Sequence, residues 1–324
     1  MSRVLAQHGW TFGLTGLLVL LLIAARLIQP NFGISGLYSL GQSALPFALA
    51  TLGMAVVVIA GGIDLSIASM MAVCSVTAAR LMEGAGDGEA ALIVVLVLLV
   101  GAGMGAINGA LVVLTRVPDI VVTLAMLFVW QGTALLILNA PGGAMVPWLR
   151  ALIDGGVTLP GVPEGLTAWV PKSLIFLIVC ALVVWLPIRR SKLGLMFYAI
   201  GSDPLAAFRS GVAVGRTKVA AYAVTGLFAA LGGLALTINT GNGAPIPGPY
   251  LLSSVAAVVL GGVVLSGGKG GLLGPILAVF TLRLVRLDLT LLSIDPNVAT
   301  IIEGSIMVVV VMLGAVVAMR GQVK

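Results

Sequence analysis

Charged residues are scarce in this chain. Only 9% of its 324 residues are Asp, Glu, Lys or Arg, whereas 60% are hydrophobic. An average soluble domain has about 25% charged and about 45–50% hydrophobic residues. This deficit of charge excludes a water-soluble globular fold and predicts a protein that lies in a lipid bilayer.

Histidine and cysteine are almost missing. The single histidine is His8, and the two cysteines, Cys74 and Cys180, lie within apolar runs. Chemistry that depends on histidine bases, metal clusters or disulfides is therefore not expected. We predict no metal site and no cofactor in this chain.

A phosphate-binding Gly-x-x-x-x-Gly-Lys-Ser/Thr sequence is also lacking. Residues 265–270 read Leu-Ser-Gly-Gly-Lys-Gly and resemble the signature loop of ATPase domains, but Gly270 stands where the phosphate motif needs a hydroxyl. We interpret these glycines as a tight turn and predict that the chain is not an enzyme.

Long apolar stretches fill the sequence. A spanning helix needs about 20 mostly apolar residues. The ten candidates are residues 11–28, 43–60, 65–82, 91–114, 120–138, 172–188, 218–239, 250–265, 271–286 and 298–319. The chain, residues 1–324, is thus predicted to be a single all-α integral membrane domain with about ten transmembrane helices.

The basic residues indicate the orientation, because cytoplasmic loops are enriched in Lys and Arg. With a cytoplasmic N-terminus, the inner side receives Arg3, Arg116, Arg189, Arg190, Lys192, Arg209, Arg216, Lys218, Lys269, Arg320 and Lys324. The outer side holds Arg26, Arg80, Arg150, Lys172, Arg283 and Arg286. Both termini are therefore predicted to be cytoplasmic. The net charge of +6 reflects this topology, and we expect no nucleic-acid partner.

Residues 139–171 then form an outer loop. A loop of this length is typical of a functional segment or a short surface helix. Its tryptophans, Trp148 and Trp169, are equally typical of anchors at the membrane interface.

Residues 61–66, Gly-Gly-Ile-Asp-Leu-Ser, place an acid at the edge of the membrane. Asp64 is well positioned to cap the helix that follows. A helix break at this point would instead expose polar groups to a solute pathway, as in transporters. The two interpretations are compatible.

Polar side chains within the apolar stretches are the candidates for contacts along such a pathway. They are Gln42, Asp64, Ser66, Asn108, Thr123, Gln131, Asn239, Ser253, Ser254 and Glu303. Gly101, Gly105 and Gly109 recur at intervals of four, which indicates close helix packing rather than chemistry.

The inner segment 189–218 contains the signals of a two-turn helix. Asp203 is a candidate N-cap, Pro204 suits the first helical position, and Gly211 suits the position after the end. Because so short a helix is marginal in water, it should pack on this chain or on another protein through Leu205 and Phe208.

Several pieces of the sequence, in order, resemble the membrane permease of bacterial ABC sugar importers of the ribose type. They are Pro30-Asn31-Phe32, Gly53-Met54, residues 61–66, Asn108-Gly109, Val117-Pro118, Thr123-Leu124, Tyr198-Ala199-Ile200-Gly201, Ser210-Gly211-Val212, Ala256 to Gly262 and Gly267 to Gly270. The resemblance runs from about residue 30 to the C-terminus.

This resemblance implies a multi-pass permease in the bacterial inner membrane that carries a sugar or sugar-like polyol into the cytoplasm. Its implied partners are a cytoplasmic ABC ATPase, which binds ATP and magnesium, a periplasmic sugar-binding protein, and a second permease copy or a paralogous permease. The helix implied to dock on the ATPase comprises Gly201, Ser202, Asp203, Pro204, Leu205, Ala206, Ala207, Phe208, Arg209, Ser210 and Gly211.

Other classes of membrane protein stay open from the residues alone. An ion-coupled secondary transporter of a small polar solute would normally carry inverted repeats and several intramembrane acids, and only Asp64 and Glu303 qualify here. A membrane enzyme would need a nucleophile or metal constellation, and none is apparent. A purely structural membrane subunit is disfavoured by the docking signals.

Overall fold

The computed structural model describes residues 2–158 and 167–322, and these are helical, with only two isolated β-bridges. The long helices are α1 (Ser2–Ile28), α2 (Ile34–Ile59), α3 (Ile67–Met82), α4 (Asp87–Thr115), α5 (Asp119–Ile137), α8 (Lys172–Arg190), α11 (Val214–Thr240), α13 (Leu273–Leu291) and α14 (Pro296–Gln322). The short helices are α6 (Pro147–Ala151), α9 (Lys192–Ser202), α10 (Pro204–Arg209) and α12 (Tyr250–Leu260).

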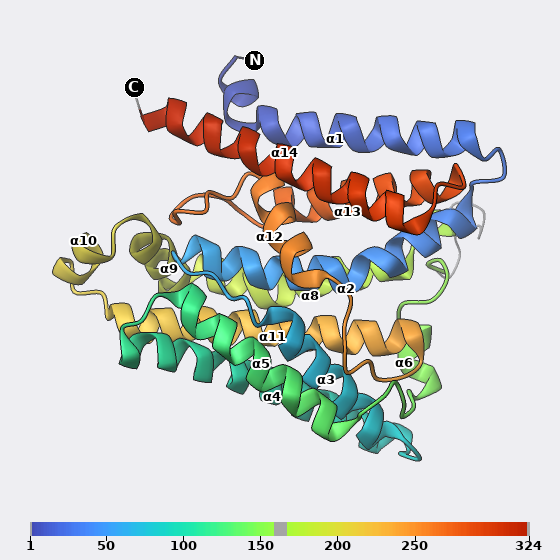
Figure 1. Ribbon diagram of the computed structural model, residues 1–324, viewed down its shortest axis with the longest axis horizontal. Helices are drawn as coiled ribbons and strands as arrows, with labels where there is room; N and C mark the ends of the chain where they lie inside the picture. Colours follow the sequence, from blue (N-terminus) through green and yellow to red (C-terminus); the bar gives the residue numbers. More distant parts are fainter. Residues whose placement is uncertain (1, 159–166, 323–324) are drawn as a thin grey trace.

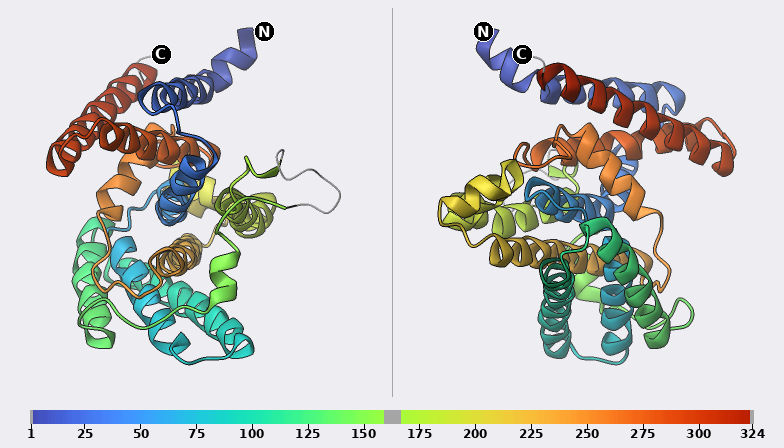
Figure 2. Two further views of the ribbon diagram at one scale, coloured as in Figure 1. Left: turned by 90° about the vertical axis from the view of Figure 1, so that its right-hand side faces the viewer. Right: turned by 60° about the vertical axis from the view of Figure 1, so that its left-hand side comes forward.

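Helix α2 lies at the centre of the bundle. All its residues from Ala44 to Ile59 are buried, as expected for a helix that is apolar on every side. It packs against α11 and α3 on one side and against α12 and α13 on the other. Helices α1, α13 and α14 form a separate layer above it (Figure 2).

The two ends of the bundle are distinct. The chain termini and the helices α9 and α10 lie toward one end, on the left in Figure 1, whereas α6 lies at the opposite end. Helix α6 belongs to the predicted outer loop, of which residues 159–166 lie outside the described residues. The predicted inner and outer segments are thus found at opposite ends.

All ten predicted apolar stretches fall on helices. Among the described residues, six helices are long and apolar enough to cross a membrane: α1 from Trp10, α2, α4, α5, α8 and α11. Helices α3 and α12 are apolar but shorter. The predicted stretch 250–265 is helical only to Leu260, because Gly262 adopts a positive φ of 80° and turns the chain.

The glycine stripe of α4 packs against α11. A methyl group on Gly105 would overlap the carbonyl oxygen of Tyr222, and one on Gly101 would overlap that of Gly226. Gly103 has nothing near its missing side chain. The prediction that this stripe serves packing is confirmed, since only glycine lets the two backbones approach this closely.

Helix α9 was not predicted. Residues 192–202 were expected to be part of an inner loop, but Ser191 caps this helix by accepting a hydrogen bond from the Leu193 amide at 3.2 Å. Phe197 and Ile200 then pack into the core. Tertiary burial therefore stabilises a helix too short to be recognised as a membrane span.

Candidate functional site

The loop 61–66 between α2 and α3 is fixed by the carboxylate of Asp64. This side chain is fully buried. Its Oδ1 accepts hydrogen bonds from the Ser66 amide at 2.9 Å and from the Ser66 hydroxyl at 2.6 Å. Helix α3 begins at Ile67 with Ser66 as its N-cap. The prediction that Asp64 caps this helix is wrong, because its side chain bonds two residues ahead, before the helix begins.

Asn108 of α4 completes this cluster. Its Nδ2 lies 2.7 Å from the Ser66 hydroxyl and 3.3 Å from Oδ2 of Asp64, and its Oδ1 accepts a bond from Nε1 of Trp130 at 3.1 Å. Asp64, Ser66 and Asn108 have no exposed surface. The structure thus brings together three predicted residues and adds Trp130 of α5, which no sequence signal had singled out.

Thr123 of α5 holds the same loop from another side. Its hydroxyl oxygen accepts a bond from the Leu65 amide at 3.1 Å and lies 2.8 Å from the Asp119 carbonyl oxygen one helical turn earlier. Because this hydroxyl satisfies a loop amide and a helix carbonyl, it has little capacity left for a solute.

Asp119, at the start of α5, forms the adjoining ion pair. Its Oδ1 lies 2.7 Å from Nζ of Lys218, and its Oδ2 accepts a bond from the Tyr222 hydroxyl at 2.8 Å. Both partners are on α11. Sequence reasoning missed this group, since Asp119 and Lys218 are 99 residues apart, and each stands at the edge of a predicted apolar stretch where a charge attracts no attention.

At the opposite end of the bundle, Asn239 of α11 binds α2. Its Nδ2 donates to the carbonyl oxygen of Gln42 at 2.7 Å. In a regular helix that carbonyl would accept from residue 46, but Pro46 has no amide hydrogen. Asn239 therefore supplies the donor that the proline removes. The side chain of Gln42 in turn donates to Asp154 at 2.9 Å.

The other predicted pathway residues lie on different elements. Gln131 of α5 donates to the Pro245 carbonyl at 2.6 Å. Ser253 is buried in α12, and Ser254 bonds the Leu251 carbonyl of its own helix. Glu303 of α14 pairs with Arg286 of α13 at 2.8 Å. The ten residues thus form separate groups rather than one site.

Helix α10 has the predicted caps at both ends. Oδ1 of Asp203 accepts bonds from the amides of Leu205 at 2.9 Å and Ala206 at 3.0 Å. After the helix, Gly211 has a φ of 84°, and the Val212 amide donates to the Ala207 carbonyl at 3.0 Å. This pattern is a Schellman motif, so the prediction of a capped two-turn helix is confirmed.

Leu205 and Phe208 of α10 are exposed, whereas Ala207 faces the protein. Their exposed fractions are 58% and 67%, against 5% for Ala207. The sequence predicts that Leu205 and Phe208 pack either on this chain or on another protein. The described residues of this chain do not cover them.

Helix α9 links α10 to the loop 61–66. The Tyr198 hydroxyl donates to the Gly270 carbonyl at 2.9 Å, and burial raises the pKa of this phenol, so it remains a neutral donor. The Gly268 amide donates to the Ile59 carbonyl at 2.9 Å, and Gly201 packs directly on Ile59. Three backbone segments therefore meet at the end of α2.

The groups described above are hydrogen bonds that join helices and loops, together with one exposed apolar helix face. Within the part of the chain that the structure describes, no three His, Cys, Asp or Glu side chains gather as metal ligands would. The buried hydrogen bonds fix the loop 61–66 between helices. Helix α9 contacts this loop at Gly61 and also contacts α10.

Comparison with known proteins identifies the family. Residues 36–311 match the family described as branched-chain amino acid transport system / permease component. The autoinducer 2 import system permease protein LsrD of Escherichia coli (strain K12) is 29% identical over 334 residues, which cover 98% of this chain and 96% of the relative. The protein of the same name from Shigella flexneri matches to the same extent. No solved structure matches.

These matches confirm the resemblance seen in the sequence. They confirm the prediction that the chain is a transport subunit of the bacterial inner membrane without an ATPase site of its own. The chain therefore belongs to the branched-chain amino acid transport system permease family and is the multi-pass permease subunit of an ABC-type import system.

Proposed function

We propose that this permease carries a sugar or sugar-like polyol from the periplasm to the cytoplasm, driven by ATP hydrolysis in a separate ATPase subunit that docks on α10. The exposed face of α10 carries this proposal. A short helix that is capped at both ends, and whose two large apolar side chains remain in solvent, is suited to bind another protein.

The proposed orientation places both termini and α9–α10 in the cytoplasm, with about ten helices in the membrane. It is supported by the position of α10 and the two termini at one end of the bundle (Figure 1). It is also supported by the basic residues of the segment 189–218, since cations favour the cytoplasmic side.

The cargo is proposed from the relatives and from the ribose-type resemblance. The relatives are named for import of autoinducer 2. We expect a small hydroxylated solute, delivered by a periplasmic binding protein to a pair of permeases. The proposed first contacts are Gln42 and Gln131, toward the outer end. Asn239 instead binds the α2 backbone, and the closed cluster around Asp64 holds the loop 61–66.

An ion-coupled carrier is the less favoured alternative. Glu303 is bonded to Arg286, and Asp64 to Ser66 and Asn108. Acids that bind and release a coupling ion need lone pairs that the ion can reach. The hydrogen bonding of these two acids therefore supports transport driven by a partner ATPase.

The test is reconstitution in proteoliposomes with the partner ATPase and binding protein, with ATP hydrolysis and uptake measured together. We expect Leu205→Asp and Phe208→Asp to reduce ATPase association at least tenfold, because each inserts a charge into an apolar contact. Leu152→Asp is the matched control, since this leucine is also exposed but follows α6 at the other end. Unchanged association in both α10 variants contradicts the docking proposal, and uptake without any ATPase favours the ion-coupled carrier.

A further inference from the structure

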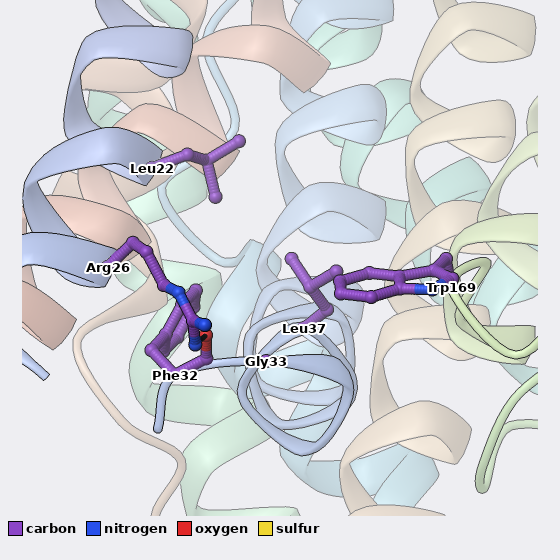
Figure 3. Close-up of a pocket in the computed structure, with 6 residues that line it drawn as sticks. All are labelled: Leu22, Arg26, Phe32, Gly33, Leu37 and Trp169. Atoms are coloured by element: carbon purple, nitrogen blue, oxygen red, sulfur yellow. Dashed lines mark hydrogen bonds between the residues drawn. The ribbon is translucent and has the colours of Figure 1, made fainter. Parts of the chain in front are cut away.

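A pocket of about 370 Å³ lies where α1 ends and α2 begins. It is lined by Leu22, Arg26, Phe32, Gly33, Leu37 and Trp169. Figure 3 shows Leu22 and Arg26 of α1 on one side and Leu37 and Trp169 on the other, with Phe32 and Gly33 between them. The pocket therefore joins one cation to a mostly apolar lining, at the end of the bundle opposite α10.

Arg26 is held at the rim of this pocket. Its Nη1 donates to the Phe32 carbonyl at 2.6 Å, which fixes the guanidinium and leaves its other N–H groups for a second acceptor. No acidic side chain of the described residues pairs with it within 4.0 Å, whereas Arg80 pairs with Glu83 at this same end. Arg26 also lies on the side where basic residues are disfavoured, so its presence needs a reason.

The pocket adjoins a surface suited to acyl chains. Its inner wall rests on a small core of Ala25, Phe32, Leu40 and Leu284. Next to it, α1 exposes large apolar side chains, with exposed fractions of 52% for Ile23 and 77% for Leu27. Trp169 is half exposed, as is typical of tryptophan at the level of lipid headgroups.

We propose that this pocket binds an anionic phospholipid of the outer leaflet. The phosphate would accept hydrogen bonds from Arg26, which as a planar cation is well suited to phosphate oxygens. The upper part of an acyl chain would lie against Leu22, Leu37 and Trp169. A small hydroxylated solute fits less well, because apart from Arg26 no lining side chain except the Trp169 indole offers a polar group. This site is independent of the ATPase and of the transported cargo.

The experiment measures quenching of tryptophan fluorescence in the full chain, reconstituted in bilayers that contain phosphatidylglycerol or phosphatidylcholine brominated on the acyl chains. Comparison with Trp169→Phe isolates the signal of Trp169 from the other four tryptophans. A cation near a membrane surface contributes about 1 kcal/mol toward an anionic lipid, or about a fivefold preference. We expect a fivefold preference of the Trp169 site for phosphatidylglycerol, lost in Arg26→Gln and kept in Arg26→Lys.

Lys172→Gln is the matched control, because this partly exposed cation lies at the same end and bonds a backbone carbonyl without lining the pocket. It should leave the preference unchanged. If Arg26→Gln does not fold, Leu37→Phe tests the same site by filling the pocket and should reduce quenching by both lipids. Equal quenching by the two lipids in the unmodified chain overturns the proposal. So does complete displacement of the lipid by millimolar inorganic phosphate, which would indicate a simple anion site.

Discussion

At the scale of single residues, the polar groups inside this bundle mainly satisfy backbone and side-chain partners within the chain. Asn239 illustrates this. It was singled out as a polar residue at membrane depth, yet its Nδ2 replaces the amide hydrogen that Pro46 lacks and bonds the Gln42 carbonyl. A buried carbonyl without a donor costs about 1–3 kcal/mol, which accounts for an amide side chain at this position.

Replacement of this amide should therefore destabilise the protein. We expect Asn239→Leu to lower the free energy of unfolding by about 1–3 kcal/mol, measured by denaturation in detergent. In a Pro46→Ala background the cost should fall by at least half, because the substituted alanine supplies its own amide hydrogen to the Gln42 carbonyl. An equal loss of unfolding free energy in both backgrounds would show that the bond to Gln42 is not what makes Asn239 stabilising.

At the scale of elements, close backbone contacts position the helices. The contact of α4 with α11 depends on glycines that leave no room for a side chain, whereas Gly103 on the same helix faces open space. The same residue type therefore has opposite roles two positions apart, and a matched pair of substitutions separates them.

Gly105→Ala should lower the free energy of unfolding by about 1–3 kcal/mol, because the added methyl overlaps the Tyr222 carbonyl. Gly103→Ala should leave stability unchanged or raise it by up to about 1 kcal/mol, since alanine is the better helix former. Thermal unfolding of the two variants in the same detergent gives the comparison. Similar losses in both would contradict the packing role of the stripe.

The cap of α10 can be tested separately from its apolar face. Asp203→Ala removes the acceptor for the Leu205 and Ala206 amides and should cost about 1 kcal/mol of local helix stability. If α10 docks on the ATPase, association should weaken about fivefold, as measured by co-purification or interferometry. Asp203→Asn keeps an N-cap, so its affinity for the ATPase should stay within about twofold of that of the unmodified chain. A loss in Asp203→Asn as large as in Asp203→Ala would point to the charge instead.

At the scale of the whole molecule, the fold separates the end that carries α10, the proposed docking helix, from the end that carries α6. The termini, α9 and α10 share one end, whereas α6 and the junction of α1 with α2, which lines the pocket at Arg26, lie at the other (Figure 1). Three backbone segments, at Ile59, Gly201 and Gly268, meet at the end that carries α10. Helix α9 therefore contacts both α10 and α2, the helix that leads into the loop 61–66.

This separation predicts the side from which each end can be labelled. The two native cysteines are first removed by Cys74→Ser and Cys180→Ala. In this background, Ser210→Cys should react with an impermeant maleimide only in inside-out vesicles. Gly88→Cys, at an exposed position at the start of α4, should react only from the periplasmic side. Labelling of both from one side would refute the orientation.

The sequence alone determined those features that depend on residues close together in the chain. Apolar runs identified the ten long stretches that become helices, and Asp203, Pro204 and Gly211 specified α10, because capping bonds join residues only two to five positions apart. Only the tertiary structure decided which distant polar groups meet, as Asp64 does with Asn108 and Asp119 with Lys218. It also decided that Asp64 does not cap α3, that α9 is a helix, and that Leu205 and Phe208 remain uncovered, because burial and partner geometry arise only when the helices pack together.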